Sequence, residues 1–167
     1  VVGVPPSHPQ RLQRAGFSGV EISAGHGHLL HQFLSPWSNR RTDEYGCDLK
    51  NRTRFLTELV SAIRGECGNP FVIALKLPGD DGVAGGIDPD MASSIDTLLA
   101  EQAGDFDLWT WVWGAHARSL HLHLPDADGP RHPYPEHIKA LRSGHPGIAT
   151  GAIGYLTGLV ECETALT

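Results

Sequence analysis

The segment most informative about the fold class reads Gly19-Val20-Glu21-Ile22-Ser23-Ala24-Gly25-His26-Gly27-His28-Leu29-Leu30-His31-Gln32-Phe33-Leu34. Its first residues are mostly small or β-branched and predict a short strand, Gly19 to Ala24. Gly25 and Gly27 then interrupt the strand, and glycine lets a ligand approach the backbone closely. Polar side chains at the carboxyl end of a strand are typical of sites in parallel α/β proteins. The segment therefore predicts a strand that delivers histidines to a site.

Similar strand-like runs recur at Phe71–Leu77, Asp107–Trp113 and Gly147–Ile153, and they begin 36 and 40 residues apart. Helical patterns lie between the four runs. They are Asn51–Arg64 with one apolar stripe, a helix opened by Asp88 and Pro89, and Pro135–Arg142. A strand and a helix that repeat at this interval predict parallel βα units.

The expected class is therefore α/β, as part of a TIM (β/α)8 barrel with about four βα units. A closed barrel of this type needs eight strands, and an open set leaves two sheet edges unpaired. We expect a single partial barrel domain over residues 1–167, truncated at both ends. The longer first interval is expected to hold a loop, Gln32–Leu49, in a position where long loops usually build sites.

Composition narrows the class of partner. The formal charge is −6 and no long run of Lys or Arg occurs, which argues against nucleic acid and anionic lipid and favours a small-molecule substrate. No apolar run approaches the length of a membrane span. The three cysteines fit neither a metal motif nor a disulfide framework, so a reducing, cytoplasmic location is expected.

The histidines after the first strand allow two functional hypotheses. Each of His26, His28 and His31 taken alone is typical of a loop or cap residue, but their cluster at a strand end favours a site. One alternative is a metal-dependent barrel hydrolase in which His26 and His28 bind the ion. The further ligands would come from the set His116, His121, His123, Asp80 and Asp81.

Two following runs complete a recognisable pattern. They read Leu34-Ser35-Pro36-Trp37-Ser38-Asn39-Arg40-Arg41-Thr42-Asp43-Glu44-Tyr45-Gly46 and Asn51-Arg52-Thr53-Arg54-Phe55. Together with the histidine segment, this order resembles the Old Yellow Enzyme family. The resemblance implies an FMN-dependent oxidoreductase that takes hydride from NADH or NADPH and passes it to an activated alkene or related substrate. The arginines of these runs are expected to hold the loop by charge-assisted bonds.

The resemblance also implies roles for individual residues. Ser23, which replaces a histidine of the family, and His26 would bind the substrate carbonyl, and His28 stands where the family has a proton-donating tyrosine. Lys76 would lie near the pyrimidine end of FMN, and Gly151 and Ala152 near its phosphate.

The extent of the resemblance leaves a further alternative open. It covers nearly the whole chain but only the family's strands four to seven, so the contacts of the other strands are missing. A non-catalytic half-barrel that associates with another chain, including a homo-oligomer formed through exposed sheet edges, is therefore a second expectation.

Overall fold

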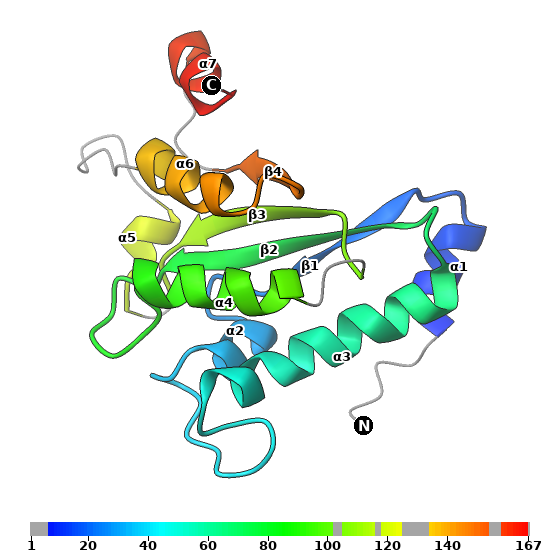
Figure 1. Cartoon of the computed structure of the whole chain (residues 1–167), viewed down its shortest axis with the longest axis horizontal. Coiled ribbons are helices and arrows are strands. Elements are labelled where there is room, and N and C mark those ends of the chain that lie inside the picture. The colour runs from blue at the N-terminus through cyan, green and yellow to red at the C-terminus, as the bar shows by residue number, and fades with distance from the viewer. Residues whose placement is uncertain (1–6, 102–104, 116–117, 125–133, 154–157, 167) are drawn as a thin grey trace.

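Four parallel strands form one sheet in the computed structural model, in the order β1-β2-β3-β4 (Figure 1). The structure describes residues 7–101, 105–115, 118–124, 134–153 and 158–166. The strands are β1 (Gly19–Ser23), β2 (Val72–Asp80), β3 (Leu108–Trp113) and β4 (Ala149–Ala152). Each strand pairs with the next one along the chain, as consecutive βα units of a barrel do.

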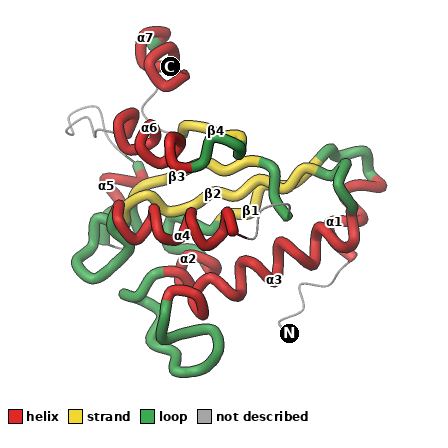
Figure 2. Tube along the Cα trace, viewed as in Figure 1, coloured by secondary structure: helices red, strands yellow, loops and turns green. Residues whose placement is uncertain are grey.

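The helices of the described residues alternate with these strands (Figure 2). They are α1 (Ser7–Arg14), α2 (Leu29–Leu34), α3 (Leu49–Cys67), α4 (Pro89–Glu101), α5 (Leu120–His123), α6 (Tyr134–Gly144) and α7 (Leu159–Leu166). Asp48 caps α3 by accepting the Asn51 N–H at 2.8 Å, and Asp88 caps α4 through the Met91 N–H at 2.8 Å. Each cap is formed by residues three apart in the sequence, so the local sequence determines where α3 and α4 begin.

One face of the sheet forms the hydrophobic core. Alternate strand residues on this face are buried, namely Ile22, Ile73, Leu75, Leu77, Trp109 and Trp111. The apolar stripes of α3 and α4 contribute Phe55, Leu56, Val60, Ile63, Ala92, Ile95 and Leu99. Figure 1 shows α3 and α4 side by side along this face.

We call the other side of the sheet the open face. It carries Glu21, Ser23, Val72, Lys76, Thr110, Ala149 and Gly151, as strand alternation and register require. Glu21, Ser23 and Ala149 are exposed, and Val72 is 42% exposed. In a closed parallel barrel, this face would line the interior.

The predicted elements are confirmed in type, with corrections to their bounds. β2 runs past Leu77 to Asp80, because its pairing with β3 continues through Pro78 and an irregularity before Asp80. The prediction of a loop over Gln32–Leu49 was wrong at its start, because α2 extends to Leu34. The α/β class and the partial barrel are confirmed.

Arginines hold the loop between α2 and α3, which projects away from the sheet in Figure 2. The buried Arg52 donates to the Leu34 carbonyl at 2.9 Å and to the Cys47 carbonyl at 3.0 Å. Arg54 donates to the Glu44 carbonyl at 2.8 Å. The expectation that arginines organise this loop is therefore confirmed for these two residues.

A buried carboxyl lies between α4 and β3. Asp96 is 0% exposed, and its Oδ2 accepts a hydrogen bond from Trp111 Nε1 at 2.9 Å. Its Oδ1 has no partner among the described residues. Burial raises the pKa of Asp96 from 3.8 to about 7, against the opposing effect of the Trp111 bond.

Asp96→Asn should change how stability depends on pH. The folded chain keeps the Asp96 proton up to about pH 7, whereas the unfolded chain loses it near pH 3.8. The stability of the parent should therefore fall between about pH 4 and 7 by up to roughly 4 kcal/mol, and stay low above that range. In Asp96→Asn this fall should be absent.

Urea unfolding at pH 4, 6 and 8 measures this difference. Asp90→Asn, on the exposed side of the same helix, should keep the pH dependence of the parent. Parallel pH profiles for the parent and Asp96→Asn would contradict the assignment of the fall to this carboxyl.

Candidate active site

Polar side chains gather on the open face where β1, β2 and β3 pair. Ser23 is the register partner of Lys76, and Lys76 is the register partner of Thr110. Thr110 is buried, and its hydroxyl has no hydrogen-bond partner among the described residues. Two of the predicted site residues, Ser23 and Lys76, are therefore neighbours across a strand pair.

Gly151 continues this row on β4, where it pairs with Thr110. A Cβ atom at position 151 would come within 2.6 Å of Thr110 Cγ2, so any residue larger than glycine would displace the Thr110 side chain or separate β4 from β3. Ala152 follows in register with Trp111. The segment 154–157 that follows β4 lies outside the described residues.

An ion pair within the chain neutralises the charge of Lys76. Lys76 Nζ lies 2.6 Å from Glu21 Oε1, and the two side chains are 25% and 40% exposed. Glu21, on the neighbouring strand, supplies the opposite charge. An exposed pair of this kind contributes little stability, so its main effect is to orient the ammonium.

His26 lies three residues after the end of β1, in an unusual backbone conformation. Its φ is 60°, in the left-handed region that non-glycine residues rarely adopt. Its ring stacks on the ring of His123, with centroids 3.7 Å apart and planes at 9°. Burial, followed by the positive charges of His123 and Lys76, lowers the pKa of His26 to about 4. His26 is therefore a neutral imidazole at neutral pH.

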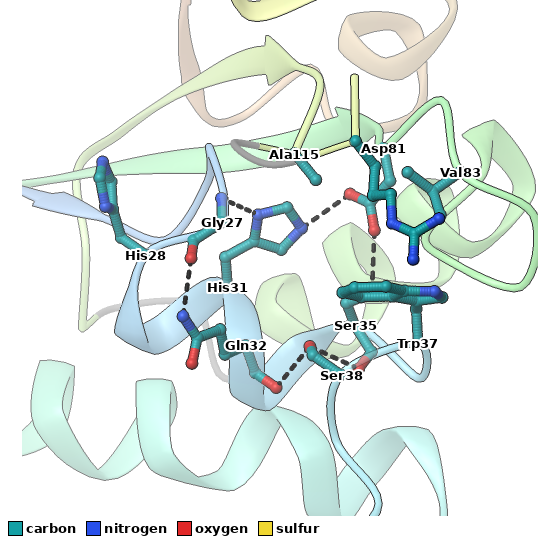
Figure 3. A pocket seen from close by; sticks show the side chains of 11 residues that line it. Gly27, His28, His31, Gln32, Ser35, Trp37, Ser38, Asp81, Val83 and Ala115 are labelled. Carbon is teal, nitrogen blue, oxygen red and sulfur yellow. Dashed lines mark hydrogen bonds and ion pairs between the residues drawn. The ribbon is translucent and has the colours of Figure 1, made fainter. Parts of the chain in front are cut away.

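His28 lies apart from that stack, at the N-cap of α2, where its side chain makes no capping bond. It is exposed and lines a cavity of about 640 Å³. Figure 3 shows its side chain directed away from Asp81 and Trp37 on the same cavity. Ser23, His26 and Lys76 are not among the residues that line this cavity.

A buried hydrogen-bond network around Asp81 lies behind the histidines (Figure 3). The Gly27 N–H donates to His31 Nδ1 at 2.6 Å, so the proton of this neutral ring is on Nε2. His31 Nε2 then donates to Asp81 Oδ1 at 2.7 Å. The other carboxylate oxygen accepts from Ser35 Oγ at 2.9 Å and from the Ile87 N–H at 2.8 Å.

Asp81 also connects this network to the segment after β3. Its backbone carbonyl accepts a hydrogen bond from Ser119 Oγ, and Ser119 is fully buried at the start of α5. Sequence reasoning considered Asp81 only as a potential metal ligand. The usable signal was an aspartate directly after a strand, but its partners come from segments far away in the sequence.

The metal hypothesis gains no support from the geometry. Among the described residues, no group of three or more His, Cys, Asp or Glu side chains is placed to hold a metal ion. Asp81 is engaged by three donors, and His116 lies outside the described residues. In the described part of the chain, no helix is both long and apolar enough to cross a bilayer.

His31→Phe should destabilise the fold by about 2 to 4 kcal/mol, because it leaves the Gly27 N–H and one oxygen of Asp81 buried without partners. Gln32→Ala is the matched control, since Gln32 Nε2 binds the carbonyl of the same glycine at an exposed position. Its cost should stay below about 1 kcal/mol. Urea unfolding at pH 7 measures both, and equal costs would contradict the network's importance.

Comparison with known proteins agrees with this architecture. The model of the NADH:flavin oxidoreductase / NADH oxidase family matches residues 9–151. An NADPH dehydrogenase of Bacillus cytotoxicus is 32% identical over 156 residues, which cover 93% of this chain and 42% of that protein. The chain thus spans less than half the length of this relative.

Two solved structures superpose on most of this chain. A 2-naphthoyl-CoA reductase in complex with 2-naphthoyl-CoA superposes with a TM-score of 0.81 at 26% identity, covering 95% of this chain and 24% of that one. Morphinone reductase superposes with a TM-score of 0.67 at 29% identity, covering 94% and 39%. The resemblance predicted from the sequence is confirmed. Because the family model matches most of the chain, the chain belongs to the NADH:flavin oxidoreductase / NADH oxidase family.

Proposed function

We propose that this chain, as one partial barrel domain, provides the substrate-facing part of an FMN-dependent oxidoreductase. Its reductant would be NADH or NADPH, and its substrate an activated alkene or a related small molecule. The proposal rests on one observation: Ser23, Lys76 and the unpaired hydroxyl of Thr110 lie side by side on the open face. Family membership and relatives named NADPH dehydrogenase and morphinone reductase support it.

The residues of the open face fit a flavin. A flavin ring is flat and carries hydrogen-bonding groups along one edge, and Lys76, Ser23 and Thr110 offer an ammonium and two hydroxyls in one row. The buried Thr110 hydroxyl lacks a partner among the described residues, and a bound polar group would satisfy it. Gly151 leaves backbone accessible at the end of that row, with Ala152 beside it. Lys76, Gly151 and Ala152 would hold the cofactor.

Each catalytic residue would act through its own chemistry. Bound FMN supplies the hydride that the reaction transfers. Neutral His26 offers one N–H to the carbonyl oxygen of the substrate, and the Ser23 hydroxyl offers a second donor. His28 is exposed, and histidine is the commonest general acid in enzymes, so we assign it as the proton donor.

Lys76→Ala should weaken FMN binding on the order of tenfold to a hundredfold, the loss expected for one charged contact. The absorbance spectrum of the purified chain, incubated with FMN and then desalted, measures the retained flavin. Glu21→Gln is the matched control, because it removes the ion pair but keeps the cation, and it should retain flavin. Folding of each variant is checked by circular dichroism.

The two outcomes have distinct meanings. Flavin that the parent and Glu21→Gln retain and Lys76→Ala loses supports a cofactor site on the open face. No visible flavin band with the parent chain would reject the proposal that these residues form a working cofactor site by themselves.

A second candidate function is association of two copies into a full barrel, without catalysis by one copy alone. The specific observation is the exposed open face with its free edges on β1 and β4. Two copies related by a two-fold axis would pair β4 of one with β1 of the other, in parallel, and give the eight strands that a closed barrel needs. This arrangement would satisfy the edge backbone groups.

Val72→Lys tests this association. Val72 is 42% exposed in the single chain, so the variant should fold normally, but a closed barrel would bury the new charge at a large cost. Analytical ultracentrifugation should find a dimer for the parent and a monomer for Val72→Lys. Ser93→Lys, on an exposed position of α4, should remain dimeric. A monomeric parent would exclude the association.

The state of the cysteines indicates the redox state of the compartment in which the protein functions. Cys47, Cys67 and Cys162 are all unpaired, and Cys67 is buried. Free thiols are typical of proteins in reducing compartments. We therefore propose a cytoplasmic location.

A further inference from the structure

His123 is a residue of the site that the proposed chemistry does not yet use. It closes α5, a single turn after β3, and its ring lies parallel to that of His26 at 3.7 Å. Among aromatic pairs, parallel contact at this distance means nearly complete overlap of two flat rings. The pair joins the segment after β1 to the segment after β3, across the carboxyl ends of three strands.

Several contacts hold α5 in place and thereby fix the position of the His123 ring on His26. Gly114 has a φ of 83°, and a Cβ atom at this position would come within 2.8 Å of the backbone nitrogen of His123. The turn therefore needs glycine. Leu122 packs against the hydrophobic core and lies close to Gly82. Ser119 accepts the Ala115 N–H at 2.7 Å and donates to the Asp81 carbonyl.

The partner ring is fixed from the other side by the same network. Gly27, which follows His26, donates its N–H to His31, and His31 donates to the Asp81 carboxylate. Asp81 therefore fixes both segments, one through its side chain and one through its backbone. The left-handed backbone of His26 adds a strained conformation of the kind that clusters at functional sites.

We propose that His123 is a positioning residue for His26: its ring fixes the orientation of the His26 imidazole and keeps that imidazole in its neutral form, with one N–H donor. This inference rests on the proposed function, since it concerns the same carbonyl-binding histidine. His123 itself would touch neither substrate nor cofactor. Its action would reach the reaction only through His26.

Electrostatics agrees with the geometry. The titratable groups that act on His26 are His123 from α5, Lys76 from β2, and His28 and His31 from its own side of the site. All are bases, so each opposes a proton on His26. A second positive charge stacked on the His26 ring would be especially unfavourable at such a short distance. The neutral form then presents one N–H whose direction the stack determines.

The test is a histidine-labelled NMR titration of the whole chain without cofactor. In the parent, the His26 ring should titrate near 4, below the ordinary 6.5, and its ring protons should show the upfield shift of a stacked ring. His123→Ala should raise the pKa of His26 by about one pH unit or more and abolish that upfield shift. His26→Gln identifies the His26 signal by its loss.

His123→Phe separates stacking from charge. It keeps a flat ring over His26 but cannot be protonated, so the upfield shift should persist while the pKa of His26 rises by less than in His123→Ala. His145, which contacts Trp109 edge-on at 5.0 Å, is the internal control, and its ring signals at a fixed pH should be the same in all forms.

The outcomes decide the proposal without any activity measurement. A parent His26 that titrates near 6.5, or a His26 signal that neither variant changes, would overturn it. If His123→Ala fails to fold, His123→Phe alone decides through the raised pKa with the upfield shift retained. Flavin retention, measured separately, reports on the proposed function, so either idea can fail while the other stands.

Discussion

The buried carboxylate of Asp81 is the constraint on which the site depends. It is 2% exposed and accepts hydrogen bonds from His31, Ser35 and the Ile87 backbone, which offset the cost of removing a charge from water. Two of these donors belong to α2 and its C-cap, and the third follows Asp81 by six residues. Through its carbonyl, Asp81 also holds Ser119 and hence α5. One residue after β2 thereby fixes the segments that follow β1 and β3, the first through its side chain and the second through its backbone carbonyl.

The two faces of the sheet show why a part of a barrel can keep its architecture. The helix-covered face buries a continuous apolar core that these four strands and their helices form together. The open face carries an ion pair, hydroxyls and a glycine instead, and its partly exposed ion pair has little effect on stability. Stability and chemistry are therefore separated between the two faces. The chain spans less than half of its relatives and still superposes on them.

Prediction from the sequence succeeded where the physical cause is local. The spacing of apolar residues predicted α3 and α4 with their buried stripes, and Asp88 with Pro89 predicted where α4 begins. It failed where a neighbouring strand determines the length of an element. Pairing with β3 extends β2 to Asp80, three residues past the predicted end. The roles assigned to Ser23, His28, Lys76, Gly151 and Ala152 came from family resemblance and stay predictions, although Ser23 and Lys76 do lie side by side.

The sequence by itself determined the alternation of strand and helix, the parallel class and the family, because periodicity, caps and long motifs are properties of neighbouring residues. Only the tertiary structure decided that Glu21 pairs with Lys76, that Asp81 accepts hydrogen bonds from His31 and Ser35, and that His123 stacks on His26. Such contacts join segments distant in sequence. Their existence depends on which strands lie side by side and on the paths of the loops, and the spacing of apolar residues within one segment does not encode these.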